Sequence, residues 1–456
     1  MHRTRLMVPF MIMLVFFLLA GCYESKGMDR PGSTTNVPGS TGPLSNDKFT
    51  TLRYMIWNSN FIVTYQKMFA EFNKENPNIK VDLQVVPWGN YWDKLMNEIA
   101  GGNAPDIFWG YMPRFPGFID KGAVLDITDY IKNDKMDLSK YNSSTVEAYT
   151  VNGKNYSVPQ NFGVMGIIYN QDLLIKAGID QYPSNLKWNP KDGGTFVEFL
   201  QKLTWDKNGK HPNEEGFDSK NIVQYGFNLI DKDQVDPGQL IGLIASNGGA
   251  MMNDSKLALD GKLTETYQFI YDLTFKYHVA PTYTDIHTGG SESKFLSGQI
   301  AVWMNGQWMM KTLKEKADFN WGIGPLPDGP AGNYALVSGL GDVIYSKTKN
   351  PEASWKLVKF MVSQRAQDIL AESGIVFPGN KDSIPKFVDY YNRLGINPQP
   401  FVEGYNGQTV VSPALKNYND WYQTFVKYTS IMMSGEMDPK TTLDKLKQEG
   451  DMAANQ

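Results

Sequence analysis

The 456-residue chain contains one cysteine, Cys22, so it forms no internal disulfide. Only four histidines are present, namely His2, His211, His278 and His287. This scarcity argues against a metal site built from histidine and cysteine, and we expect no metal and no cofactor. The charges nearly balance, with 44 Lys and Arg against 48 Asp and Glu, for a net charge of −4. No basic excess is available to bind nucleic acid, so we expect no nucleic-acid partner.

The common catalytic motifs are also missing. The sequence has no Gly-x-Ser-x-Gly elbow, no phosphate-binding glycine loop ending in Lys-Ser or Lys-Thr, and no His-Glu-x-x-His. These absences predict that the protein is not an enzyme. A glycosidase requires only two carboxylates across a sugar-binding cleft. With 48 acidic residues, a secreted glycoside hydrolase therefore stays open as an alternative.

Transmembrane-like apolar sequence is limited to the N-terminus. Residues 6–19 form an apolar run that follows Arg3 and Arg5, and the run closes at Leu19-Ala20-Gly21-Cys22. The run is shorter than the roughly 20 residues of a comfortable membrane span. The pattern resembles the bacterial lipoprotein signal, in which the cysteine is acylated and becomes the first residue after cleavage. We therefore predict a signal peptide at 1–21 and lipidation at Cys22, with a free thiol as the alternative.

The lipid on Cys22 would anchor the protein to the cell membrane on its extracytoplasmic face, and we expect the source to be a Gram-positive bacterium. Residues 22–48 are rich in Gly, Ser, Thr, Pro and Asn and have few large apolar side chains. Such a segment buries too little surface to fold. We predict that 22–48 is the lipidated cysteine followed by a flexible linker.

The body of the chain is long enough for two domains. Its first part alternates predicted strands and helices: strand 51–57, helix 61–73, strand 79–85, helix 92–100 and strand 106–109. This alternation is typical of a parallel sheet covered by helices, and it predicts an α/β fold.

Residues 295–310 predict where a ligand binds. A helix ends at Gly298, an apolar strand covers 300–304, and a loop at Gly306 leads into another helix. Ligands of open α/β sheets bind beyond the carboxyl ends of the strands, which makes Asn305 and Trp308 candidate contacts. Trp303, inside the strand, is equally consistent with the core. Further candidates follow the earlier strands, and they are Trp57, Asn58, Trp88, Trp109 and Tyr111. For Trp88 and Trp109 the alternative is packing against neighbouring helices.

The same stretch resembles a signature of the extracellular solute-binding proteins of carbohydrate ABC importers, a group that includes the maltose-binding protein. The matching residues are Ser297-Gly298, Ala301 and Asn305-Gly306-Gln307-Trp308. Segments 76–81, 100–107 and 167–174 match the family in the same order. The resemblance extends from about residue 49 to the C-terminus.

The resemblance implies a two-lobed, periplasmic-binding-protein-like α/β fold, in which each lobe is a helix-covered sheet and hinge segments join the lobes. The chain would cross between lobes near Gln160, Ser338 and Tyr390. Lobe 1 would comprise 49–160 and 341–390, and lobe 2 would comprise 161–340 and 391–456.

The resemblance also implies a function. The protein would capture a mono- or oligosaccharide in the cleft between the lobes, as a monomer, and deliver it to an ABC permease with ATPase subunits. By their positions in the family motifs, the ligand contacts would include Arg114, Asp236, Trp308 and Trp421. Pro113 and Gly238 depart from the maltose-binding pattern and leave the sugar open. A carbohydrate-sensing surface lipoprotein is a further alternative.

Two smaller hypotheses concern single features. The guanidinium of Arg114 could bind the carboxylate of a uronate, because its fork matches two carboxylate oxygens. The polar loop 206–218 carries several oxygen-bearing side chains in an order loosely like that of a calcium loop, although their spacing does not match. Either a bound cation or a solvated loop fits that sequence.

Overall fold

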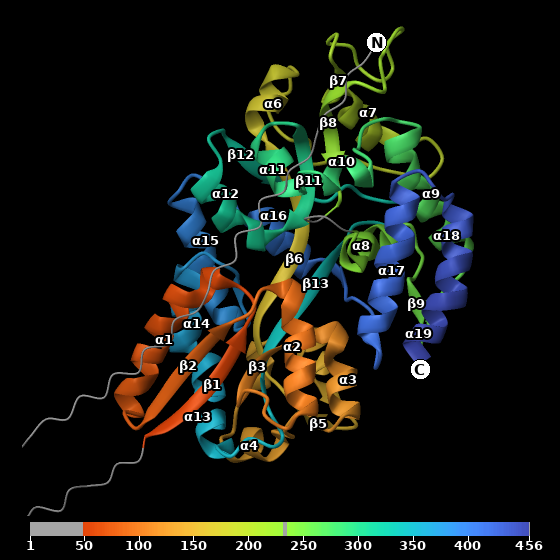
Figure 1. The fold of residues 1–456 in the computed structure, drawn as a ribbon. Coiled ribbons are helices and arrows are strands. Elements are labelled where there is room, and N and C mark those ends of the chain that lie inside the picture. Colours follow the sequence, from red (N-terminus) through yellow and green to blue (C-terminus); the bar gives the residue numbers. More distant parts are fainter. Residues whose placement is uncertain (1–48, 231–234, 456) are drawn as a thin grey trace, which may run out of the picture. The chain divides into compact units, whose positions relative to one another are not determined.

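The computed structural model describes residues 49–230 and 235–455 (Figure 1). These residues form one compact unit. The predicted signal peptide 1–21, the lipidation site Cys22 and the linker 22–48 lie outside the described residues and stay predictions. Within the described part of the chain, every helix is too short or too polar to cross a membrane.

The first part of the chain builds a parallel three-stranded arrangement. The strands are β1 (Thr50–Ile56), β2 (Ile79–Val85) and β3 (Ile107–Tyr111), and β1 pairs in parallel with both others. The helices α1 (Ile62–Glu75) and α2 (Trp88–Ala100) connect them. This order of strands and helices confirms the one predicted from the sequence. The helices are needed because parallel neighbouring strands must be joined by crossover connections.

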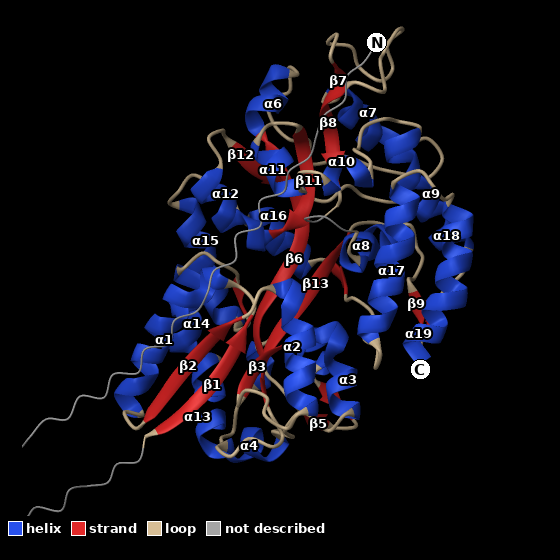
Figure 2. Cartoon of the chain, viewed as in Figure 1, coloured by secondary structure: helices blue, strands red, loops and turns tan. Residues whose placement is uncertain are grey.

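Two long strands run through the middle of the sheet (Figure 2). They are β6 (Pro159–Asn170) and β13 (Tyr334–Ile344), and they pair antiparallel. One side of β13 pairs with β3, whereas β6 pairs with β11 (Ile300–Gly306). Eight strands of the eleven-stranded sheet therefore follow the order β2-β1-β3-β13-β6-β11-β8-β7, with β8 at Ile222–Asn228 and β7 at Trp205–Asp206. The other three pair beside this path: β12 (Trp321–Gly324) and β14 (Phe377–Pro378) with β6, and β15 (Gln408–Val410) with β13.

The buried apolar side chains form two separate clusters. The first core packs around β1 and β3 and draws on residues between 52 and 158 and between 343 and 376. The second core packs around β6, β8 and β11 and draws on residues 162–337 and 371–454. Each core is built from discontinuous segments because β6 and β13 both pass from one core to the other.

The lobe boundaries predicted from the sequence stay predictions. The first two crossings, near Gln160 and Ser338, fall where the core membership changes. For the third crossing, Phe377 and Phe387 already pack in the second core. This packing favours a crossing after Val376, the last residue of the first core, over the predicted position at Tyr390.

The remaining elements cover the two cores. Around the first core lie η2 (Met112–Arg114), α3 (Phe115–Asp120), α4 (Thr128–Asn133), η3 (Leu138–Lys140), α5 (Ser143–Ala148), β4 (Thr150–Val151), β5 (Lys154–Asn155), α13 (Pro351–Met361) and α14 (Gln364–Glu372).

Elements that contribute to the second core or adjoin it are α6 (Gln171–Lys176), α7 (Gly194–Lys202), α8 (Pro237–Ser246), β9 (Met252–Asn253), β10 (Lys256–Leu257), α9 (Gly261–Phe275), α10 (Tyr283–His287), α11 (Ser291–Leu296), η4 (Gln307–Met309), α12 (Met310–Lys316), β12 (Trp321–Gly324), β14 (Phe377–Pro378), α15 (Ile384–Asn392), α16 (Gln399–Asn406), β15 (Gln408–Val410), α17 (Tyr418–Met433), α18 (Pro439–Lys445), the π-helical turn η6 (Leu446–Gly450) and α19 (Asp451–Asn455).

Candidate functional site

The candidate site lies where the two central strands pass between the cores. There Ser338 of β13 is paired with Gly163 of β6. The indole of Trp308, in η4 directly after β11, lies against this pair. A Cβ atom at Gly163 would come within 2.8 Å of Cζ3 of Trp308, and one at Gly306 would overlap the same ring. Both positions therefore need glycine, and the partly buried Trp308 ring forms one wall of the site.

The second wall comes from the end of β3. Tyr111, the last residue of that strand, lies beside Ser338 and Ser412, and burial raises the pKa of its hydroxyl well above the ordinary value. Arg114 follows in η2, and only 8% of its surface is exposed. Its guanidinium carbon lies 4.3 Å from the centre of the Trp92 ring, within cation–π range. The tyrosine and the arginine therefore extend from the first core towards the junction.

The same guanidinium contacts α17, which belongs to the second core. Nη1 of Arg114 donates a hydrogen bond to Oδ1 of Asn419 over 2.8 Å. The rings of Tyr418 and Tyr422 lie 5.2 and 5.8 Å from the guanidinium carbon. Burial lowers the pKa of Arg114, and the neighbouring tyrosines and Asp236 oppose that shift.

Asp236 completes the polar part of the site. Its carboxylate caps α8, where Oδ1 accepts a bond from the N–H of Gly238 at 2.8 Å, while Gln239 closes the capping box. The hydroxyl of Tyr422 donates to Oδ2 at 3.1 Å. Pro237 at the first helical position fixes the start of the helix. Asp236 is therefore held at the N-terminus of α8, facing the same tyrosines as Arg114.

Two further rings lie at the carboxyl ends of the parallel strands. Trp57 follows β1 and Trp88 begins α2, and their centroids are 5.1 Å apart. The ring of Trp88 in turn lies 5.7 Å from Tyr111. Asn58 caps the next turn by accepting a bond from the N–H of Asn60 at 3.0 Å. Trp57, Trp88 and Tyr111 thus form a row of partly buried rings that ends at Arg114.

Three of the predicted contacts lie inside the cores in this structure. Trp109 is fully buried and donates its indole N–H to the hydroxyl of Tyr65 at 3.0 Å. Trp421 is 1% exposed and packs against Phe425. Asn305 is fully buried in β11, opposite Gly166. These side chains present no surface on which a solute could lie in this arrangement.

Sequence reasoning missed Trp92, Tyr418 and Tyr422. The last two occur at positions i and i+4 of α17 and so share one face of that helix, next to Trp421. The helical spacing was available in the sequence, but it could not tell which of these rings faces Arg114.

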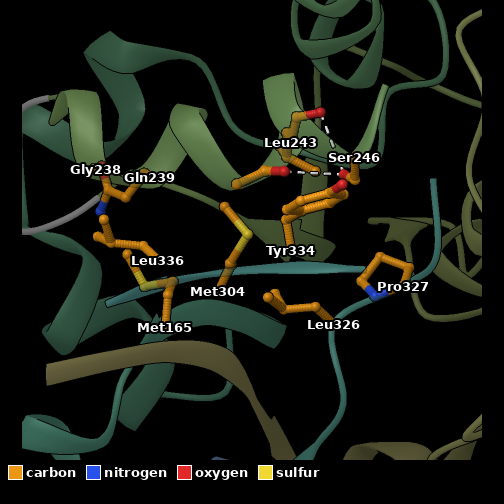
Figure 3. A pocket seen from close by; sticks show the side chains of 11 residues that line it. Met165, Gly238, Gln239, Leu243, Ser246, Met304, Leu326, Pro327, Tyr334 and Leu336 are labelled. Carbon is orange, nitrogen blue, oxygen red and sulfur yellow. Dashed lines mark hydrogen bonds between the residues drawn. The ribbon is translucent and has the colours of Figure 1, made fainter. Parts of the chain in front are cut away.

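A separate small cavity lies within the second core, beside the start of α8 (Figure 3). Its volume of about 10 Å³ corresponds to roughly one water molecule. It is too small for an organic solute. The side chains around it are mostly apolar, and the lining residues are Met165, Gly238, Gln239, Gly242, Leu243, Ser246, Met304, Leu326, Pro327, Tyr334 and Leu336.

The loop 206–218 is organised by Asp206. Its carboxylate accepts bonds from the backbone N–H groups of Asn208, Lys210 and Asp218 at 2.8, 2.9 and 2.8 Å. Lys207 forms an ion pair with Asp218 at 3.1 Å. These N–H groups occupy the oxygens of the Asp206 carboxylate, which favours the solvated-loop interpretation. Within residues 49–230 and 235–455, no three His, Cys, Asp or Glu side chains are grouped to hold a metal ion.

Two cores joined by two long strands, with a polar and aromatic site at their junction, define a two-lobed solute-binding protein. The family described as bacterial extracellular solute-binding protein matches residues 58–368, which is more than half of the chain. The protein belongs to this family. The family and the α/β two-lobed fold predicted from the sequence are thereby confirmed.

Curated relatives include two proteins of Bacillus subtilis. The arabinooligosaccharide-binding protein is 24% identical over 77% of this chain and 74% of its own length. The maltodextrin-binding protein MdxE is 24% identical over 83% of this chain and 84% of its own.

Solved structures agree with the fold. An ABC substrate-binding protein from Listeria monocytogenes, in complex with cycloalternan, gives a TM-score of 0.77 at 25% identity. That match covers 89% of this chain and 98% of the other. UspC from M. tuberculosis gives a TM-score of 0.72 at 28% identity, over 88% of this chain and 100% of the other.

Proposed function

We propose that this protein captures a mono- or oligosaccharide at the junction of its two cores for import by an ABC permease and its ATPase subunits. The observation that carries the proposal is the row of partly buried rings, Trp57, Trp88 and Tyr111, that ends at the charged side chain of Arg114. Sugars have apolar C–H faces and hydroxyl edges, so they fit flat rings beside a few fixed polar groups. The sugar-binding names of the relatives support the same class of solute.

The site draws on both cores, which suggests how binding is coupled to motion. Trp57, Trp88, Tyr111 and Arg114 belong to elements of the first core, whereas Asp236, Trp308, Tyr418 and Tyr422 belong to elements of the second. A solute that contacts both sets binds best when they are close. It therefore shifts the population towards the closed arrangement by hinge motion. We further propose that the protein acts as a monomer, anchored outside the membrane by the lipid on Cys22.

A binding role accounts for the site better than hydrolysis. A glycosidase requires two facing carboxylates, whereas among the described residues named for this site Asp236 is the one carboxylate. Its oxygens already accept bonds from Gly238 and Tyr422. The relatives are likewise binding proteins.

A thermal-melt screen tests the proposal on the chain that begins after Cys22. Oligosaccharides, monosaccharides and uronates are each added, and the melting midpoint is recorded. A solute that binds the folded state alone adds about 2.7 kcal/mol of stability at a hundredfold excess over its dissociation constant. We expect a selective rise, with the sugar recovered unchanged. Conversion of the sugar would instead indicate the hydrolase, and no response to any sugar would refute carbohydrate binding. Loss of labelled-sugar uptake in cells lacking the protein separates import from sensing.

Removing the Trp308 ring is expected to weaken binding strongly. Trp308→Ala deletes the wall that lies against Gly163, and a central aromatic contact of this kind contributes about 2 kcal/mol or more. The dissociation constant, measured by calorimetric titration, should rise about thirtyfold. Trp205→Ala, in β7, removes a partly buried tryptophan beside Lys176 and serves as the control. Equal affinity of Trp308→Ala and wild type would exclude the ring from the site.

A further inference from the structure

The guanidinium of Arg114 is buried without an ion pair. Its exposed fraction is 8%, and no carboxylate among the described residues lies within salt-bridge distance of it. Nη1 makes its one hydrogen bond to a protein group, at 2.8 Å to Oδ1 of Asn419. Nε is buried and has no hydrogen-bond partner. The edge formed by Nε and Nη2 therefore remains available, although burial of a cation normally requires a compensating charge or full hydrogen bonding.

That edge has a specific chemical preference. Nε–H and one Nη2–H point in parallel and match the two oxygens of a carboxylate, which gives a bidentate, charge-assisted pair. The centres of the Trp92 and Tyr418 rings lie 4.3 and 5.2 Å from the guanidinium carbon. These rings restrict the orientation of the guanidinium group. A single hydroxyl oxygen satisfies one donor of the edge, whereas a carboxylate satisfies both and also supplies the missing negative charge.

The nearby carboxylate of Asp236 does not pair with the Nε and Nη2 edge of Arg114. Its two oxygens accept bonds from the N–H of Gly238 at 2.8 Å and the hydroxyl of Tyr422 at 3.1 Å. Its negative charge also faces the positive end of the α8 dipole. The surrounding phenols of Tyr111, Tyr418 and Tyr422 stay neutral, because burial raises the pKa of each well above the ordinary value. Asp236 favours the charged form of Arg114 from a distance, but among the described residues the guanidinium has no direct ion-pair partner.

We propose that Arg114 selects a carbohydrate that carries a carboxylate, such as a uronic acid unit, and binds its two oxygens through Nε and Nη2. This inference rests on the proposed carbohydrate-binding function and narrows its substrate class. The same contacts explain how the ligand reaches the guanidinium. Asn419 belongs to α17 of the second core and Arg114 to η2 beside the first. Separation of the cores therefore breaks their bond and uncovers the guanidinium edge.

The decisive experiment compares matched ligands on the unaltered protein. Oligogalacturonides and glucuronate-containing oligosaccharides are titrated beside their methyl esters, which keep the sugar and remove the charge. We expect at least one acid to bind about 10- to 100-fold more tightly than its ester, as for hydrogen bonds to charged groups. If the ester or a neutral sugar binds as tightly as every acid, the inference fails while carbohydrate binding stands. If neither acids nor neutral sugars bind, the proposed function itself fails.

Substitutions then test the residue. Arg114→Gln should remove the preference, so that the acid and its ester bind with about equal affinity. Arg114→Lys keeps the charge but not the fork and should give an intermediate value. Arg393→Gln removes an exposed positive charge at the end of α15 and should change neither affinity. Melting midpoints without ligand establish that each variant is folded. If Arg114→Gln still prefers the acid, the assignment to Arg114 is wrong.

Discussion

Asp342→Asn should become steadily more stable, relative to the wild type, as the pH rises from about 4 to about 7. Asp342 lies in β13 and is 1% exposed. Burial raises the pKa of its carboxyl group from 3.8 to about 7, against the opposing effect of the Tyr54 hydroxyl, which donates to Oδ1. Oδ2 has no hydrogen-bond partner. The folded protein therefore holds a proton here that the unfolded chain loses at a much lower pH.

The sign follows from this difference. Below about pH 3.8 the carboxyl group is protonated in both the folded and the unfolded chain, so it does not change the free energy of unfolding. Between pH 3.8 and about 7 the unfolded chain ionises while the folded protein does not, so stability falls, and above pH 7 the loss is constant. The difference between these two pKa values corresponds to about 4 kcal/mol. Asparagine cannot ionise, so at pH 8 the variant should be the more stable protein, by up to that amount.

Urea unfolding at several pH values measures this difference directly. The matched control is Asp389→Asn, which changes an exposed carboxylate on α15 and should follow the wild-type profile. Parallel pH profiles for Asp342→Asn and wild type would show that the buried carboxyl titrates normally. The expected result would also mean that the strand joining the two cores keeps its buried acid protonated up to about pH 7.

Gly117→Ala is expected to loosen the contact between α3 and the segment that precedes α17. A Lys416–Asp120 ion pair at 2.8 Å joins this segment to α3, and the N–H of Leu415 donates a bond at 3.2 Å to the carbonyl of Pro113 in the preceding turn η2. A Cβ atom at position 117 would collide with the backbone carbonyl oxygen of Lys416, which cannot rotate away. Overpacking of this kind typically costs about 1–3 kcal/mol.

The same substitution should weaken solute binding, although it touches no proposed contact. The displaced segment leads directly into Tyr418, Asn419 and Tyr422, which meet Arg114 and Asp236. Chemical unfolding and calorimetric titration measure the two effects. Gly261→Ala, at the first residue of α9 where no atom lies within 4 Å of the added methyl group, should leave both unchanged. Wild-type stability and affinity in Gly117→Ala would show that the segment is free to move from α3.

The differing positions of the tryptophans have a simple physical cause. The sequence predicted strands that end at Trp57 and Trp109, so both rings were expected at strand ends. In the structure Trp57 follows β1, whereas β3 continues to Tyr111 and Trp109 lies inside it. Successive side chains of a strand point to opposite faces, and the helices that cover each face decide which ring is enclosed. The hydroxyl of Tyr65, supplied by α1, accepts the indole N–H of Trp109 and holds it inside, whereas Trp57 stays partly exposed.

The sequence by itself determined the order of strands and helices, the strand before Trp308, and the family, because periodicity and short motifs are local properties of the chain. Only the tertiary structure decided which side chains form the site. Arg114 and its partner Asn419 are 305 residues apart. They meet because β6 and β13 carry the chain between the two cores (Figure 1). This arrangement brings α17 into contact with η2. Burial and charge pairing depend on such distant neighbours, so they arise only when the chain is folded.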